Sequence, residues 1–204
     1  MKTIGLVGGV ASGKSLVAKM LVELGAGLLD ADRTGHEVLS DDPDVQRELH
    51  KRWGDAVFAA DGTVDRAAIA RRVFATGGTA ELDRRFLEEL LHHRIRRRLL
   101  RMKDKFAAEG NPAVVLDAPV LLEAGWGQMC NIVLMVEVPR DVRLKRALQR
   151  GWTEAEFDRR EAAQWPIEDK RGAAHVTITN AGTEEELRQA VREFWDIHVA
   201  RSTD

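Results

Sequence analysis

The sequence predicts an α/β fold in which helices cover both faces of a parallel, five-stranded β-sheet. Five short segments are apolar with little alternation, as strands buried on both faces are, and amphipathic helical stretches lie between them. The segments are residues 3–7, 27–30, 113–117, 132–138 and 176–179. Ligands of such sheets bind at the carboxyl ends of the strands. Polar residues at those ends are therefore the first candidates for a functional site.

The helical stretches divide the chain unevenly. After the first strand, Leu16 and the apolar residues up to Leu24 recur at helical spacing, and Gly25 ends that helix. Residues 31–112 are too many for a simple crossover, and they contain predicted helices over 44–53, 65–74 and 81–109. We therefore expect a helical insertion that forms a second lobe.

A shorter excursion covers residues 140–174. Thr153 and Glu156 have the spacing of a capping box, which predicts a helix that begins there. Pro166 starts or breaks another helix.

Composition excludes several classes of protein. Hydrophobic residues make up 44% and charged residues 31%, which argues against general disorder. The net charge of -2 gives no reason to expect nucleic-acid binding. No apolar run resembles a signal peptide or a membrane span, and the single Cys130 indicates a reduced, buried thiol. We expect a cytoplasmic protein.

The first strand is followed by a phosphate-binding loop. Gly8-x4-Gly13-Lys14-Ser15 satisfies the Walker A pattern, between a strand and an amphipathic helix as that pattern requires. Glycines let backbone N–H groups approach phosphate oxygens, and the helix N-terminus adds partial positive charge. Lys14 is expected to reach the β- and γ-phosphates, and the Ser15 hydroxyl to bind Mg²⁺. The Asn-Lys-x-Asp guanine reader of GTPases is missing from the sequence, so ATP is favoured.

Carboxylates end two further strands. Asp30 and Asp32 are two residues apart, so an extended chain would point them the same way. One of them can accept the proton of an attacking hydroxyl, as kinase chemistry requires; Asp32 can alternatively cap the next helix. Asp117 ends an apolar run and can hold Mg²⁺ through water or orient the active site.

Two regions are rich in arginine. Residues 84–105 carry an excess of basic side chains around His92 and His93; most read as a solvated helix face, and a few can face a phosphorylated substrate. After the fourth strand, Arg140, Arg143, Arg146 and Arg150 form a stripe along one side of a helix. Arginines of a closing lid can neutralise a moving phosphoryl group, but for Arg143 we favour surface solvation.

Further motifs extend the pattern over nearly the whole chain. They are Gly5-Leu6-Val7-Gly8-Gly9, Ser12-Gly13-Lys14-Ser15, Asp30-Ala31-Asp32, Trp53-Gly54, Asp61-Gly62-Thr63-Val64-Asp65-Arg66, Val73-Phe74, His92, Asp117-Ala118-Pro119-Val120-Leu121-Leu122-Glu123, Arg146, Arg150, Gln164, Lys170 and Asn180-x-Gly182. Together these motifs resemble those of the bacterial dephospho-CoA kinases. The phosphate loop is shared by many enzymes, whereas the stretches 61–66 and 117–123 are more specific.

The chain departs from that family pattern at four positions. Ala11 replaces the usual Gly, although a small residue still permits a tight loop, and Leu16 replaces a common Thr. His93 replaces the usual Pro after His92, which leaves the backbone there less fixed. His175 replaces a frequent Asp before the last strand, and we assign no role to it.

The resemblance implies a specific reaction, the transfer of the γ-phosphoryl of ATP to the ribose 3′-hydroxyl of dephospho-CoA. Asp32 would be the general base or would orient the hydroxyl, and Lys14, Mg²⁺ and Arg146 would stabilise the transferred charge. Asn180 would border the adenine. The implied ATP-binding set is Gly9, Ala11, Ser12, Gly13, Lys14, Ser15, Leu16 and Asn180, with Ser15 at the metal. The implied substrate-binding set is Asp30, Asp32, Arg66, His92, Asp117 and Pro119.

The implied architecture is a three-layer P-loop kinase fold with a five-stranded parallel sheet, a helical substrate lobe and a lid. We expect one domain with a core (1–58, 110–139, 175–204), a helical substrate-binding insertion (59–109) and a lid (140–174). The expected partners are small molecules, without nucleic acid or membrane, for a monomer or weak homo-oligomer. Two rivals stay open: another small-molecule P-loop kinase, and an ATP-binding regulatory switch that binds a protein partner.

Overall fold

The computed structural model describes residues 1–75 and 77–200. Its backbone contacts divide the chain into two compact units. The sheet unit consists of Met1–Asp30 and the chain from Met102 onward, and the helical unit is Ala31–Arg101. Each unit is described by itself.

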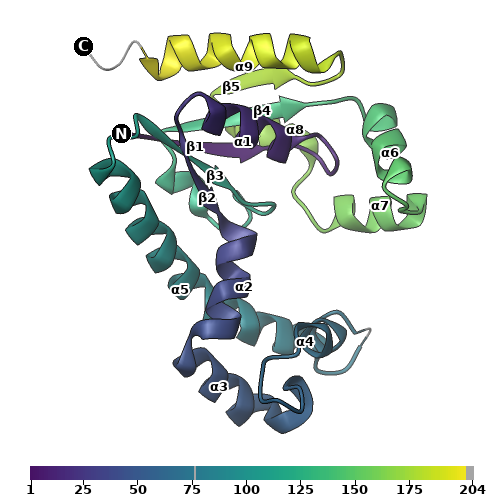
Figure 1. Ribbon diagram of the computed structural model, residues 1–204. Helices are drawn as coiled ribbons and strands as arrows, with labels where there is room; N and C mark the ends of the chain where they lie inside the picture. Colours follow the sequence, from purple (N-terminus) through teal and green to yellow (C-terminus); the bar gives the residue numbers. More distant parts are fainter. Residues whose placement is uncertain (76, 201–204) are drawn as a thin grey trace. The chain divides into compact units, whose positions relative to one another are not determined.

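A parallel sheet forms the middle layer of the sheet unit (Figure 1). Among the described residues it has five strands in the order β2-β3-β1-β4-β5, and every neighbouring pair is parallel. The strands are β1 (Lys2–Val7), β2 (Gly27–Asp30), β3 (Ala113–Asp117), β4 (Ile132–Glu137) and β5 (Val176–Thr179). The predicted sheet and the positions of its strands are confirmed.

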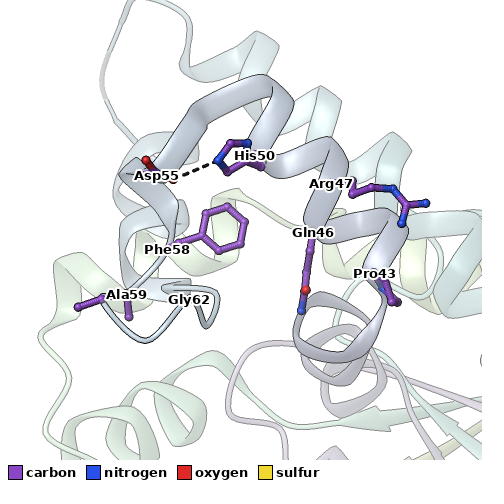
Figure 2. Close-up of a pocket in the computed structure, with 9 residues that line it drawn as sticks. Pro43, Gln46, Arg47, His50, Asp55, Phe58, Ala59 and Gly62 are labelled. Atoms are coloured by element: carbon purple, nitrogen blue, oxygen red, sulfur yellow. Dashed lines mark hydrogen bonds and ion pairs between the residues drawn. The ribbon is translucent and has the colours of Figure 1, made fainter.

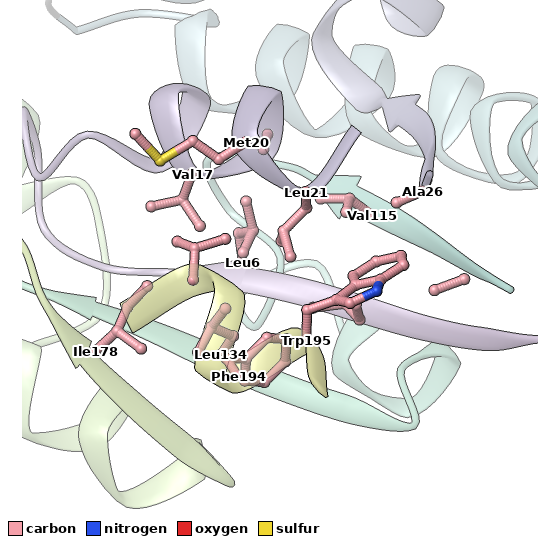
Figure 3. Packing of buried hydrophobic residues seen from close by; sticks show 14 of the residues in the cluster. Leu6, Val17, Met20, Leu21, Ala26, Val115, Leu134, Ile178, Phe194 and Trp195 are labelled. Atoms are coloured by element: carbon pink, nitrogen blue, oxygen red, sulfur yellow. The ribbon is translucent and has the colours of Figure 1, made fainter. Parts of the chain in front are cut away.

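Two helices bury one face of this sheet. α1 (Lys14–Glu23) and α9 (Glu184–His198) pack against each other. Figure 3 shows their apolar side chains gathered over Leu6 and Leu134 of the strands. The amphipathic spacing predicted for α1 therefore supplies its buried stripe, and Gly25 ends the helix with a φ of 107° as expected.

On the other face of the sheet, two glycines allow neighbouring side chains to pack closely against the strands. A side chain at Gly5 would meet the Cys130 sulfur at 2.5 Å, and one at Gly27 would meet the Phe106 ring at 2.4 Å. Phe106 lies near the end of α5 (Ala80–Ala108). Cys130 is a half-buried thiol whose pKa burial raises to about 11, which makes it unreactive near neutral pH.

Helices after β4 form the remaining part of the sheet unit. They are α6 (Arg140–Gln149), α7 (Glu154–Ala162) and α8 (Ile167–Ala173), and a short 3₁₀ helix, η2 (Trp126–Met129), precedes β4. The predicted capping box at the start of α7 is present in full, and Pro166 directly precedes α8. His175, directly before β5, bonds to Val133 of β4: its backbone N–H donates to the Val133 carbonyl oxygen at 2.9 Å, and the Val133 N–H donates to its Nδ1 at 3.0 Å.

The helical unit has its own apolar core. It contains α2 (Ala31–Asp41), α3 (Pro43–Trp53), the 3₁₀ helix η1 (Gly54–Val57), α4 (Arg66–Val73) and the greater part of α5. The helices expected over 44–53, 65–74 and 81–109 are found to within one residue at each end. Buried apolar residues of all these helices form one cluster, with Leu49, Val57 and Ile69 among them.

A buried carboxylate fixes the packing of these helices. The side chain of Asp83 is 3% exposed and accepts hydrogen bonds from Trp53 Nε1 at 3.1 Å and Arg52 Nη2 at 3.0 Å. Burial alone would raise its pKa, but the donors Trp53, Arg52 and Thr79 outweigh that cost and lower the pKa below its ordinary value. Asp83 is therefore a charged anchor between α3 and α5.

Candidate active site

The phosphate loop lies between the end of β1 at Val7 and the start of α1 at Lys14. Gly13, the residue before the helix, has a φ of 91°. A side chain there would meet the Asn180 amide nitrogen at 2.3 Å. Gly8 is equally confined, because a side chain would meet the Val136 carbonyl oxygen at 2.6 Å. Both glycines of the motif are thus required by space as well as by backbone conformation.

Ala11 takes the left-handed conformation in this loop. Its φ is 59°, and among the described residues it is the one non-glycine residue with a positive φ. The conformation costs an L-residue roughly 1–2 kcal/mol. Ala11, one of the four positions at which this chain departs from the pattern of the family it resembles, is therefore strained.

The Ser12 hydroxyl is a buried polar group within the loop. Ser12 is 1% exposed, and its Oγ has no hydrogen-bond partner among the described residues. Buried hydroxyls are nearly always satisfied. An oxygen-rich ligand such as a phosphate would supply the missing acceptor.

Lys14 bends back over the loop. Its Nζ donates to the carbonyl oxygens of Gly8 at 3.2 Å and Gly9 at 3.4 Å. Burial, the largest cause, lowers the pKa of Lys14 to about 8, and the nearby cations Lys170 and Arg143 act in the same direction. The loop thus holds an ammonium group that a phosphate would stabilise in its charged form.

A hydroxyl and a carboxylate lie next to each other close to this lysine. Ser15 Oγ donates to Asp117 Oδ2 at 3.4 Å, and Asp117 pairs in register with Asp30 of the neighbouring strand. A hydroxyl and a carboxylate are the hard oxygen ligands that suit Mg²⁺, which usually keeps several waters and binds few protein groups. In residues 1–75 and 77–200 no group of three or more His, Cys, Asp or Glu could hold a metal ion. The residues present fit a magnesium ion that phosphates and water help to coordinate.

Asn180 is a buried residue that hydrogen-bonds to the phosphate loop. It follows β5 and is 6% exposed, and its Nδ2 donates to the Ser12 carbonyl oxygen at 2.8 Å. Arg146 Nη2 in turn donates to the Asn180 carbonyl oxygen at 2.8 Å. Asn180 therefore contacts the phosphate loop directly, whereas Arg146 contacts Asn180. Leu16, also expected at the nucleotide, packs against the core beneath.

Arg143 does not lie on the solvated surface, and that expectation was wrong. It is 4% exposed; its Nε donates to the Val138 carbonyl oxygen at 3.0 Å and its Nη1 to that of Val10 at 3.3 Å. It also pairs with Glu161. Sequence spacing cannot reveal this, because Val10 and Glu161 are distant in the chain and a helix arginine usually faces water.

Lys170 is a second buried cation, which the sequence shows only as part of the family pattern. Lys170 is 2% exposed; its Nζ donates to Gln164 Oε1 at 2.7 Å and lies 3.3 Å from Glu123 Oε1. Glu123 also accepts from the Trp165 backbone N–H at 2.8 Å. The carboxylate that ends the stretch 117–123 thus anchors the segment before α8.

The structure corrects the geometry expected for Asp30 and Asp32. Asp30 ends β2, but Ala31 already begins α2, so the chain between the two carboxylates is not extended. Asp32 is exposed in the first turn of α2. Because α2 begins at Ala31, directly after Asp30, the two carboxylates do not lie on one extended strand.

The remaining predicted residues lie on different elements. Pro119 is half-buried after β3 in the sheet unit, whereas Arg66 begins α4 and His92 is exposed on α5 in the helical unit. Several residues of the stretch 61–66 stabilise the local backbone: Asp61 accepts a hydrogen bond from the Thr63 N–H at 2.9 Å, and Asp65 caps the N-terminus of α4. Its residue types are therefore explained in part by a turn and a helix cap.

The helical unit also carries an open groove of about 700 Å³. Figure 2 shows His50 hydrogen-bonded to Asp55, with the ring of Phe58 close to the imidazole. Gln46 and Arg47 of α3 lie along the same groove. Its lining mixes polar and apolar groups and is distinct from the predicted substrate residues.

Comparison with known proteins identifies the family of this chain. A sequence model of the dephospho-CoA kinases matches residues 2–186. The chain belongs to the dephospho-CoA kinase family. It is 37% identical over 198 residues to the dephospho-CoA kinase of Geobacillus kaustophilus, across 95% of this chain and 96% of that protein.

Solved structures with the same fold extend the comparison. TT1252 from Thermus thermophilus superposes with a TM-score of 0.80 and 31% identity, over 97% of this chain and 98% of that one. The dephospho-CoA kinase from Campylobacter jejuni has a TM-score of 0.73 at 20% identity, over 98% of both chains, and shows the shared fold. Among the helices of the described residues, none has the length and apolar character needed to span a membrane.

Proposed function

We propose that this chain transfers the γ-phosphoryl group of ATP to the ribose 3′-hydroxyl of dephospho-CoA, giving coenzyme A and ADP. The observation that carries the proposal is a phosphate loop with a buried Lys14 and, next to it, the hydrogen-bonded pair Ser15 and Asp117. The chain also matches this family over residues 2–186. Both the enzyme class and the acceptor follow from this combination.

The nucleotide binds through the loop. Backbone N–H groups at the start of α1 have no acceptor within the helix and are directed at phosphate oxygens. Lys14 moves from the Gly8 and Gly9 carbonyl oxygens to the β- and γ-phosphates. We propose Gly9, Ala11, Ser12, Gly13, Lys14, Ser15, Leu16 and Asn180 as the ATP-binding set.

Ser15 and Asp117 would hold Mg²⁺, Ser15 directly and Asp117 through water or as an orienting group. The ion, when bound, neutralises negative charge on the β- and γ-phosphates. Arg146 adds positive charge where the phosphoryl group moves. A guanidinium has five N–H donors, so Arg146 can keep its contact with the Asn180 carbonyl oxygen and still meet a phosphate.

The acceptor hydroxyl would be activated by Asp32. Its carboxylate, in the first turn of α2, would accept the hydroxyl proton as the oxygen attacks the γ-phosphorus and ADP leaves. We assign Asp30, Asp117 and Pro119 of the sheet unit, and Arg66 and His92 of the helical unit, to the dephospho-CoA side. We propose that the insertion over 59–109 binds the dephospho-CoA side and that the segment over 140–174 is the lid.

The decisive assay supplies purified protein with ATP, Mg²⁺ and a panel of acceptors. We expect phosphorylation of dephospho-CoA; turnover of a nucleoside monophosphate in its place would refute the proposal. A regulatory switch would turn over none of the acceptors.

Two variants test the assigned roles. Asp32→Asn should abolish turnover and largely keep ATP binding, because it removes a base and no phosphate contact. Near-normal turnover of this variant would exclude the base role. Lys14→Ala should damage both binding and turnover, and unchanged kinetics would contradict the assignment of the loop.

A further inference from the structure

The guanidinium of Arg143 is buried between three parts of the sheet unit. Arg143 lies on α6, and its side chain is 5% exposed. It donates to the Val138 carbonyl oxygen before α6 and to the Val10 carbonyl oxygen in the phosphate loop. It also pairs with Glu161 of α7. One cation thus joins the loop to two helices that follow β4.

The contact with the loop falls where the loop changes direction. Val10 immediately precedes Ala11, whose left-handed φ of 59° turns the chain toward the N-terminus of α1. The same guanidinium lies against Gly9, where an added side-chain carbon would meet Arg143 Nη1 at 2.6 Å. Arg143 therefore holds the two residues before the strained turn that orients the following N–H groups.

The partner on α7 fixes the guanidinium in turn. Glu161 is 25% exposed and touches Arg143 through one carboxylate oxygen. The Phe157 ring, which is fully buried, lies 5.6 Å from the Arg143 guanidinium carbon. A charge-assisted hydrogen bond is roughly twice as strong as a neutral one, so the ion pair limits how far the guanidinium can leave the Val10 carbonyl.

We propose that Arg143 and Glu161 form a positioning pair that keeps the phosphate loop in its nucleotide-binding shape without touching the nucleotide. The inference rests on the proposed binding of ATP by this loop. Preorganisation of a binding loop raises affinity, because less order has to be imposed when the ligand binds. Helix α7, although it contributes no predicted ATP contact, thereby sets the affinity for ATP through Glu161.

The test uses Arg143→Met and Glu161→Gln in the full chain. We measure the Kd of ADP by calorimetry, the KM values of ATP and dephospho-CoA, kcat, and unfolding in urea. Loss of a hydrogen bond to a charged group predicts an increase of about tenfold in the Kd of ADP and the KM of ATP for Arg143→Met. Glu161→Gln, which keeps the size of the side chain, should give about threefold. The KM of dephospho-CoA should stay within about twofold in both.

Matched controls lie on α7. Asp158→Asn makes the same change of charge as Glu161→Gln, but Asp158 bonds to Arg140 on the exposed surface. Arg160→Met removes a cation that stacks on Trp152 at 4.2 Å and serves as control for Arg143→Met. Both controls should leave nucleotide affinity unchanged.

The outcomes separate this inference from the proposed function. A wild-type protein that neither binds ADP nor phosphorylates dephospho-CoA refutes the proposed function, and the positioning pair with it. An active wild type whose Glu161→Gln variant is folded and binds ADP with unchanged Kd refutes the positioning pair alone. Should Arg143→Met not fold, Glu161→Gln decides the matter by itself. A fall in stability with unchanged nucleotide affinity would show a purely structural pair.

Discussion

Replacing Lys170 by Met tests whether the buried ion pair with Glu123 holds the segment before α8. The Lys170 side chain is 3% exposed and that of Glu123 is 16% exposed, with 3.3 Å between Nζ and Oε1. After the substitution Glu123 keeps the hydrogen bond from the Trp165 N–H. It loses the cation that offsets its charge in a partly buried place.

The expected cost follows from this geometry. Removal of one partner of a buried ion pair destabilises a protein by about 3–5 kcal/mol. Because Glu123 retains one donor and some contact with water, we expect the lower end, about 3 kcal/mol. For a chain of this size 1 kcal/mol shifts the midpoint of thermal unfolding by about 2–4 °C. The midpoint should therefore fall by roughly 6–12 °C.

Urea unfolding followed by circular dichroism measures this cost directly. Arg171→Met is the control, since Arg171 is 42% exposed in its pair with Glu137 and an exposed pair contributes only about 0–1 kcal/mol. The double variant Lys170→Met, Glu123→Gln should recover much of the loss, because it removes both charges. If Lys170→Met loses less than about 1 kcal/mol, or no more than Arg171→Met, the reasoning on burial is wrong.

Three further predictions concern the site and the helical unit. The pKa of Lys14 is about 8 without nucleotide; bound phosphates favour its charged form, so affinity for ADP should fall as pH rises above about 8. Calorimetry at pH 9 in two buffers should show proton uptake that Lys14→Met lacks. Ser15→Ala should weaken binding of ADP with Mg²⁺ by about tenfold and change binding in EDTA little; an equal loss in both conditions would exclude a metal role. Asp83→Asn should lower the free energy of unfolding by about 2–4 kcal/mol. The pKa of Asp83 is lowered in the folded state, so the stability it contributes is present above about pH 4 and is lost at lower pH; urea unfolding at pH 7 and pH 3 checks both statements.

Local sequence was sufficient for the elements and for the phosphate loop. Strands buried on both faces are continuously apolar, and α1 carries its apolar stripe at helical spacing. Glycines that must adopt positive φ, and the Thr153–Glu156 capping box, are likewise readable from a few neighbouring residues. These features depend on interactions within one or two turns of chain.

The environment of individual charged residues was not readable in this way. Arg143 and Lys170 have the sequence context of exposed helix residues, but their partners Val10 and Glu123 lie far away in the chain. The start of α2 at Ala31, which separates Asp30 and Asp32 into a strand and a helix, depends on a boundary that pattern alone places only to within a few residues.

The sequence by itself determined that this chain builds a parallel sheet with a phosphate loop after its first strand, because burial and backbone conformation restrict residue types locally. Only the tertiary structure decided the strand order and the partners that hold the loop, Arg143 and Asn180, together with the contact of Arg146 with Asn180. Those depend on which distant segments meet, and a buried charge differs from a solvated one only in the groups that surround it.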